Sequence, residues 1–196
     1  MEQFARIHRI FERLSLWAVW LGGGALMLAA IMVTIDVLAR KYLNVTMSGS
    51  DEITGYVFAG ATTWAYAYCL LHRSNIRIDA LYNIFPRGVR ATLDIVGLIG
   101  LLVFMGFFTS KAVGVVEQTW VNNSVSVTTL LTPLWIPQIV WLGGLLFFNV
   151  TLIFLIVYTV LSFIVEGPGA VQKLAGTMSV QDEVAEETRG IQEMDQ

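Results

Sequence analysis

The sequence predicts an all-α integral membrane protein with four transmembrane helices, amphipathic interfacial helices, and both termini in the cytoplasm. Three observations support this fold class. First, 56% of the 196 residues are hydrophobic and only 14% are charged, whereas a soluble domain carries about 25% charged residues. Second, the charged residues are separated by uncharged stretches long enough to cross a hydrocarbon core of roughly 30 Å. Third, basic residues are concentrated on one side of these stretches.

The first predicted element is an amphipathic interfacial helix at residues 3–14. Its apolar side chains recur at helical spacing between charged ones: Phe4, Ile7, Phe11 and Leu14. An uncharged run follows, and we interpret residues 15–38 as the first span. A signal peptide is the alternative interpretation, but the run exceeds the usual hydrophobic region of about 7 to 15 residues.

An acid and a base, Asp36 and Arg40, close the first span at i, i+4 spacing. The spacing predicts a local ion pair that anchors the helix end at the headgroup level. The alternative is that Asp36 carries protons or ions, as acids inside membranes often do. A short polar loop follows at residues 41–50, in which Gly49 permits a turn.

The second predicted span covers residues 52–71. Ser50 is predicted to cap this helix, and Asp51 and Glu52 favour the positive end of its dipole. A stripe of small residues lets another backbone approach closely, either from this chain or from a second subunit: Gly55, Ala59, Thr63 and Ala67. Trp64 is predicted at the membrane interface, together with the tyrosines that follow it.

The third and fourth spans are predicted at residues 94–117 and 138–165. Before the third, apolar residues at helical spacing predict a second interfacial helix at 76–85, which Pro86 terminates. Lys111 lies about one turn inside the end of the third span and can extend outward to the headgroups. A role for Lys111 in an ion pathway is the alternative.

These elements form a single membrane domain at residues 1–166, followed by a flexible acidic cytoplasmic tail at 167–196. The basic residues near span ends set the orientation, since cytoplasmic loops carry more Lys and Arg. The side that carries the termini has Arg6, Arg9, Arg13, Arg73, Arg77, Arg87, Arg90 and Lys173, and the other side has Arg40, Lys41 and Lys111.

Several kinds of chemistry have no support in the sequence. The two histidines lie at predicted interfaces and not within a span, so a bis-histidine haem is not expected, and Cys69 has no partner for an internal disulfide. No metal, nucleotide or hydrolase motif occurs, so neither a cofactor nor an enzymatic activity is predicted. A net charge of −3 argues against nucleic acid as a partner. Because no predicted span has a charge near its centre, we expect no substrate site in this chain.

Several sequence features together carry a resemblance to a known family. An acidic pair opens the second span, and Gly60 and Trp64 follow within it. A basic residue then leads into a short signature, here Arg73 followed by Asn75, Ile76, Arg77, Ile78 and Asp79. A Ser/Thr-rich turn reaches Pro133 and Trp135 before the last span. With these features the chain resembles the small, DctQ-type membrane subunit of tripartite ATP-independent periplasmic (TRAP) transporters. Asn75 stands where the family commonly has His, and Asn cannot titrate near neutral pH.

The resemblance implies a location in the bacterial inner membrane and a supporting role in sodium-coupled uptake of an organic anion, a carboxylate or sulfonate. The substrate and sodium sites would lie in a large, elevator-type permease subunit of the DctM type. This chain would brace that subunit, contact membrane lipid, and offer part of the surface on which a periplasmic binding protein docks. Asp36, Arg40, Asp51 and Glu52 would lie near that surface, and helix capping and anchoring is the alternative for each.

Two other functions are alternatives to this interpretation. An independent homo-oligomeric transporter or channel would need transport by this chain alone, and the absence of charge at the centre of the predicted spans argues against it. A membrane anchor subunit of a redox complex would bind haem or quinone, and the absence of histidines within the spans argues against the haem form.

Overall fold

The computed structural model describes residues 2–73, 86–128 and 130–166. Within these ranges the chain forms long helices and no strand, with an isolated bridge between Val125 and Pro133. The helices are α1 (Glu2–Leu43), α2 (Ser50–Leu71), α4 (Arg87–Val121) and α5 (Trp135–Glu166). The all-helical prediction is confirmed. The predicted interfacial helix at 76–85 and the predicted tail at 167–196 lie outside the described residues.

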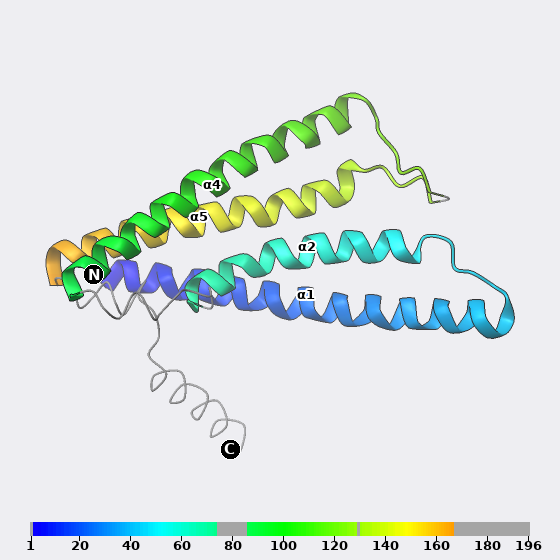
Figure 1. The fold of residues 1–196 in the computed structure, drawn as a ribbon, viewed down its shortest axis with the longest axis horizontal. Coiled ribbons are helices and arrows are strands. Elements are labelled where there is room, and N and C mark those ends of the chain that lie inside the picture. The colour runs from blue at the N-terminus through cyan, green and yellow to red at the C-terminus, as the bar shows by residue number, and fades with distance from the viewer. Residues whose placement is uncertain (1, 74–85, 129, 167–196) are drawn as a thin grey trace, which may run out of the picture.

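The helices lie side by side in the order α1, α2, α5, α4 (Figure 1). The start of α1 and the end of α5 lie at one end of the molecule, which we call the terminal end. The connections at 44–49 and 122–134 lie at the other, which we call the loop end. Buried apolar side chains of α4 and α5, with Leu70 of α2, make the core, and they include Leu98, Met105, Leu145, Leu152 and Leu155.

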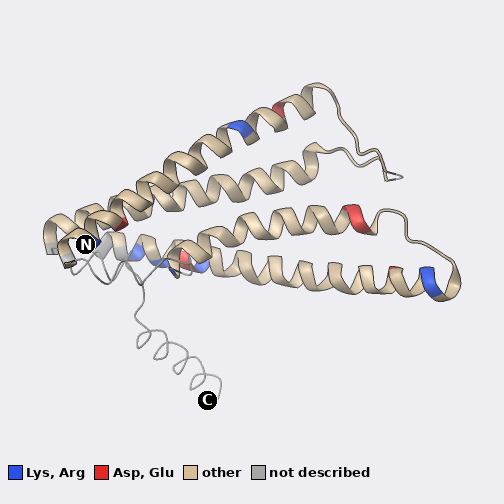
Figure 2. Cartoon of the chain, in the orientation of Figure 1, with Lys and Arg blue, Asp and Glu red and all other residues tan. Residues whose placement is uncertain are grey.

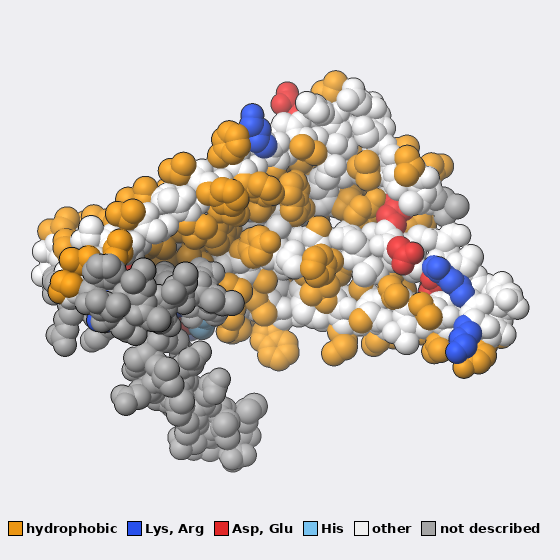
Figure 3. Space-filling model, in the orientation of Figure 1, with side chains coloured by type: hydrophobic (Ala, Val, Ile, Leu, Met, Phe, Trp, Pro, Cys, Tyr) orange, Lys and Arg blue, Asp and Glu red, His pale blue; other side chains and the backbone are white. Residues whose placement is uncertain are grey.

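The outer surface of the helices is strongly apolar. Most charged residues lie toward the two ends of the molecule in Figure 2, apart from a basic and an acidic residue on α4, and hydrophobic side chains cover much of the visible face in Figure 3. Trp17, Trp20 and Leu21 of α1 are each about 70% exposed. Such surface is costly in water and favourable in lipid, so the molecule is a membrane protein whose outer faces contact the bilayer.

Three described helices are long and apolar enough to cross a membrane: α1 from Arg6 to Leu43, α4 from Gly88 to Val121, and α5 from Trp135 to Val165. The second predicted span corresponds to α2, which has 22 residues but lower hydropathy because Ser, Thr, Gly and Tyr interrupt its apolar residues. Length and composition therefore support three of the four predicted spans.

The predicted interfacial helix at 3–14 and the predicted span at 15–38 form one continuous helix in the structure. No Gly or Pro separates them, and the Ser15 hydroxyl donates to the Glu12 carbonyl without interrupting the helix (2.9 Å). The ring of Phe11 stacks on Phe154 of α5 (5.2 Å between centroids). Phe11 of this segment therefore packs on another helix, whereas Ile7 and Leu14 on the same apolar face are 39% and 52% exposed.

Candidate functional site

Asp36 organises the polar cluster at the loop end. Its carboxylate is 1% exposed and lies where α1 approaches the first turn of α2. It accepts a hydrogen bond from the Met47 backbone N–H (2.6 Å) and one from the Ser50 hydroxyl (2.8 Å). Arg40, one turn later on α1, forms an ion pair with it. Asp36 therefore holds the α1–α2 connection in place.

The structure confirms one prediction about this connection and contradicts another. Gly49 has a φ of +96°, so the prediction that this glycine permits the turn is confirmed. The predicted cap at Ser50 is wrong, because Gly49 is the N-cap residue and no side chain caps the helix. The Ser50 hydroxyl bonds instead to Asp36, fourteen residues earlier, a contact that local sequence rules do not anticipate.

Arg40 links the buried acid to the surface. Its guanidinium pairs with Asp36 on one side and lies 3.9 Å from the Asp51 carboxylate on the other. The Asp51 side chain is 84% exposed, and that of Arg40 is 47% exposed. Asp51 is therefore free to meet a partner from outside, while Asp36 is enclosed by its donors.

Glu52 joins α2 to the connection between α4 and α5. Its carboxylate accepts hydrogen bonds from the Tyr56 hydroxyl (2.5 Å) and from the Thr128 hydroxyl. Leu130 of the same connection lies over Gly49, where an added Cβ would meet its Cδ1 at 2.2 Å. Of the acidic pair, Asp51 is therefore exposed, whereas Glu52 holds the start of α2 against the connection between α4 and α5.

The small-residue stripe of α2 is only partly an interface in this chain. Thr63 and Ala67 are buried and Ala59 is partly buried, but Gly55 is exposed, and a Cβ added there would meet no other part of the molecule within 4 Å. The closest approach is to α5, where a Cβ on Gly144 would lie 2.5 Å from the Thr63 hydroxyl oxygen. The stripe therefore packs within this chain from Ala59 onward.

Trp64 packs between α2 and α5, and its predicted position at the membrane interface stays a prediction. The indole N–H donates to the Val140 carbonyl of α5 (2.9 Å), and the ring stacks on Phe147 (5.6 Å between centroids). Gly143 leaves room for the ring, since an added Cβ there would meet it at 3.3 Å. Gly60 is buried against Val140 one turn earlier. Gly60 and Trp64, the two residues of the second span that contribute to the family resemblance, therefore both pack α2 against α5.

The remaining predicted residues lie at the ends of helices. Trp135 at the start of α5 packs edge-on against Trp120 of α4 (5.0 Å between centroids), and Pro133 pairs with Val125 in the isolated bridge. Arg73 follows the end of α2 with a φ of +53°. Asn75, Ile76 and Asp79 lie outside the described residues.

One polar contact between α4 and α5 was not predicted from the sequence. The Asn149 amide donates to the Thr109 hydroxyl (2.8 Å) and to the Leu145 carbonyl (2.8 Å). Thr109 is buried within the apolar core of the two helices. The available signal was the amide of Asn149, which interrupts an apolar helix.

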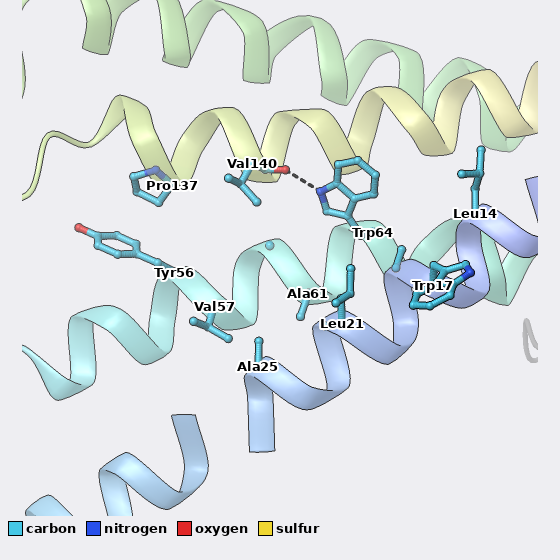
Figure 4. A pocket seen from close by; sticks show the side chains of 13 residues that line it. Leu14, Trp17, Leu21, Ala25, Tyr56, Val57, Ala61, Trp64, Pro137 and Val140 are labelled. Atoms are coloured by element: carbon cyan, nitrogen blue, oxygen red, sulfur yellow. Dashed lines mark hydrogen bonds between the residues drawn. The ribbon is translucent and has the colours of Figure 1, made fainter. Parts of the chain in front are cut away.

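An apolar groove of about 570 Å³ lies between α1, α2 and α5. In Figure 4, Leu21 and Ala25 of α1 face Val57 and Ala61 of α2, and Trp64 closes the side toward α5. Nearly all of its wall is hydrocarbon. Across residues 2–73, 86–128 and 130–166, no three His, Cys, Asp or Glu side chains gather closely enough to hold a metal ion.

Residues 29–164 match the family described as tripartite ATP-independent periplasmic transporters, DctQ component. The match covers more than half of the chain and includes the Asp36 cluster, all of α2 and the contacts between α2 and α5. No curated protein and no solved structure matches the chain. The chain therefore belongs to the DctQ component family of TRAP transporters.

Proposed function

We propose that this chain is the small membrane subunit that braces the large DctM-type permease of a TRAP transporter in the bacterial inner membrane. The family match carries the proposal. The structure is consistent with it, because the described helices pack through small, aromatic and apolar side chains. In this role the chain supplies a rigid support, while the partner subunit holds the organic anion and sodium ions.

The proposed membrane domain, residues 1–166, has four spans, with α2 as the second. Its 22 residues extend roughly 33 Å at 1.5 Å each, enough to cross the hydrocarbon core. Its polar side chains find partners inside the protein, since the hydroxyls of Thr54 and Thr63 donate to the Ser50 and Ala59 carbonyls. An even number of spans places both termini on one side, and the basic residues favour the cytoplasm.

The loop end is the proposed docking surface for the periplasmic binding protein. Asp51 is highly exposed there, Val127 is fully exposed, and Leu131 is 63% exposed. Exposed apolar side chains outside membrane-crossing helices are typical of protein contact surfaces. The bonds of Glu52 to Tyr56 and Thr128 hold the two connections in one arrangement.

Affinity purification of the tagged chain in mild detergent tests the bracing role. We expect a multi-span membrane protein to co-purify in a fixed ratio, and the pair to transport an organic anion with sodium when reconstituted with its binding protein. Recovery of the chain alone, together with solute transport by liposomes that contain only this chain, would contradict the proposal.

Surface plasmon resonance on the reconstituted pair tests the docking surface. Asp51→Lys and Val127→Asp should weaken binding of the periplasmic protein, whereas Arg9→Glu at the terminal end should leave it unchanged. An equal effect of all three substitutions would exclude a docking role for the loop end.

A further inference from the structure

The groove between α1, α2 and α5 has the length of one bilayer leaflet. It runs along α1 from Leu14 to Ala25, eleven steps of 1.5 Å or roughly 16 Å. That is about half of a hydrocarbon core of about 30 Å. Gly22 and Ala61 form part of the floor and bring α1 and α2 close together, with 3.1 Å between an added Cβ on Gly22 and the Ala61 Cβ.

The groove has too small a volume to enclose a transmembrane helix. With side chains a helix is about 10–12 Å across, so three turns fill on the order of 1,500 Å³. The groove measures about 570 Å³. A single extended hydrocarbon chain fits this space, and an almost wholly apolar wall offers no partner to a polar ligand.

Three arginines lie beyond the end of the groove that Leu14 marks. Arg13 directly precedes Leu14, and Arg9 and Arg6 follow at helical spacing toward the N-terminus. All three are exposed, and none forms an ion pair with another residue in the part of the chain that the structure describes. The guanidinium group binds phosphate oxygens in a two-pronged geometry. The end of the groove that Leu14 marks therefore lies within about two helical turns of three side chains that can bind phosphate.

We propose that the groove binds one acyl chain of an anionic phospholipid from the leaflet on the N-terminal side, with Arg13 contacting its phosphodiester. Trp17, which lines the groove and is 69% exposed, covers the glycerol region between the two. The inference requires only that the chain is inserted in a bilayer, and it goes beyond the proposed role in transport.

Photolabelling of the purified full chain tests this proposal. The probe is a phosphatidylglycerol that carries a diazirine in its acyl chain, and mass spectrometry locates the labelled peptides. We expect saturable labelling on residues 14–25 and 56–64, with competition by unlabelled phosphatidylglycerol and little by phosphatidylcholine. Labelling spread evenly over the exposed helix faces, or equal competition by the two lipids, would overturn the proposal.

Matched variants test the phosphate contact of Arg13 and the acyl-chain groove separately. Arg13→Gln should weaken the apparent affinity for phosphatidylglycerol about fivefold, whereas Lys41→Gln, the same loss of charge at the other end of α1, should not. Ala25→Phe fills the groove and should abolish the saturable labelling, and Met27→Phe on the exposed surface of α1 should not. The labelling map of the unaltered chain decides the matter if Ala25→Phe fails to fold.

A photoreactive amino acid at position 25 in native membranes distinguishes lipid from a protein occupant. Cross-linking to lipid supports the proposal. Cross-linking to a second polypeptide as the main product would show that a partner subunit occupies the groove, and would overturn it.

Discussion

At the scale of single residues, Asp36 shows how one buried carboxylate determines the path of a connection. It accepts hydrogen bonds from the Met47 backbone and the Ser50 side chain, and it pairs with Arg40. The i, i+4 pair was predictable, because residues four apart meet on a helix. The contacts with Met47 and Ser50 were not, because they depend on how the chain returns after α1.

Replacing Asp36 should therefore destabilise the protein more than replacing the neighbouring exposed acid. We expect Asp36→Asn to lower the free energy of unfolding by about 2 kcal/mol, because hydrogen bonds to a charged acceptor are lost at a buried site. Asp51→Asn should change it by less than about 0.5 kcal/mol, since Asp51 is highly exposed. Unfolding in detergent, followed by tryptophan fluorescence, measures both. Equal stability of the two variants would exclude the proposed role of Asp36.

Gly144 is a second position at which a change of one side chain, here the addition of a Cβ atom, should alter the stability of the protein. An alanine Cβ would lie 2.8 Å from the Thr63 backbone carbonyl carbon, so α2 and α5 would have to separate. Gly144→Ala should cost about 1 to 3 kcal/mol. Gly114→Ala on α4 is the control, since nothing lies within 4 Å there and alanine favours a helix by up to about 1 kcal/mol. The two substitutions should therefore have opposite signs in the same unfolding assay.

At the scale of elements, α2 illustrates why hydropathy alone underestimates an inner helix. It packs between α1 and α5, so Thr63 and Ala67 meet protein and not lipid. Polar and small residues are tolerated there, because their hydroxyls bond to the helix backbone and their size allows close packing. Trp64 and its acceptor at Val140 add a directional contact to that interface.

The contact between α4 and α5 combines an apolar core with one polar pair. We expect Asn149→Leu to cost about 0.6 kcal/mol, the average for hydrogen bonds between membrane helices. A double-mutant cycle with Thr109→Val should give a coupling energy of that size. Additive effects of the two substitutions would show that the hydrogen bond contributes nothing to stability.

At the scale of the whole molecule, α1 has the smallest share of buried residues among the three helices that are long and apolar enough to cross a membrane. Only 6% of the residues in its most apolar stretch are buried, against 33% in α5. Its 42 residues extend roughly 63 Å, about twice the thickness of a hydrocarbon core. Part of α1 therefore lies outside the core or α1 is strongly tilted, and its exposed face is available to lipid along its length.

Cysteine accessibility checks the proposed topology. In a Cys69→Ser background, Asp51→Cys should react with a membrane-impermeant maleimide added from the periplasm. Arg9→Cys should react only after the inner membrane is opened. Reaction of both from the same side of the membrane would show that α1 does not cross it.

The sequence by itself determined the class of this protein, its helical segments and its family. Those conclusions rest on residue types and on regular spacing, which are local properties: uncharged runs, the Asp36 and Arg40 spacing, Gly49 in a turn, and the order of the resemblance motifs. The extents of α2 and α5 follow the predicted spans at 52–71 and 138–165 to within three residues for the same reason, whereas α4 begins seven residues before and ends four residues after the predicted span at 94–117.

Only the tertiary structure decided which side chains meet. It bonded Trp64 to α5, replaced the predicted Ser50 cap with a bond to Asp36, joined Glu52 to Thr128, and divided the small-residue stripe at Gly55. Each outcome depends on the order α1, α2, α5, α4, and the hydrogen bonds among them join residues separated by up to 76 positions. The periodicity of a helix shows which residues share a face, but the neighbour of that face is set by packing of the whole bundle.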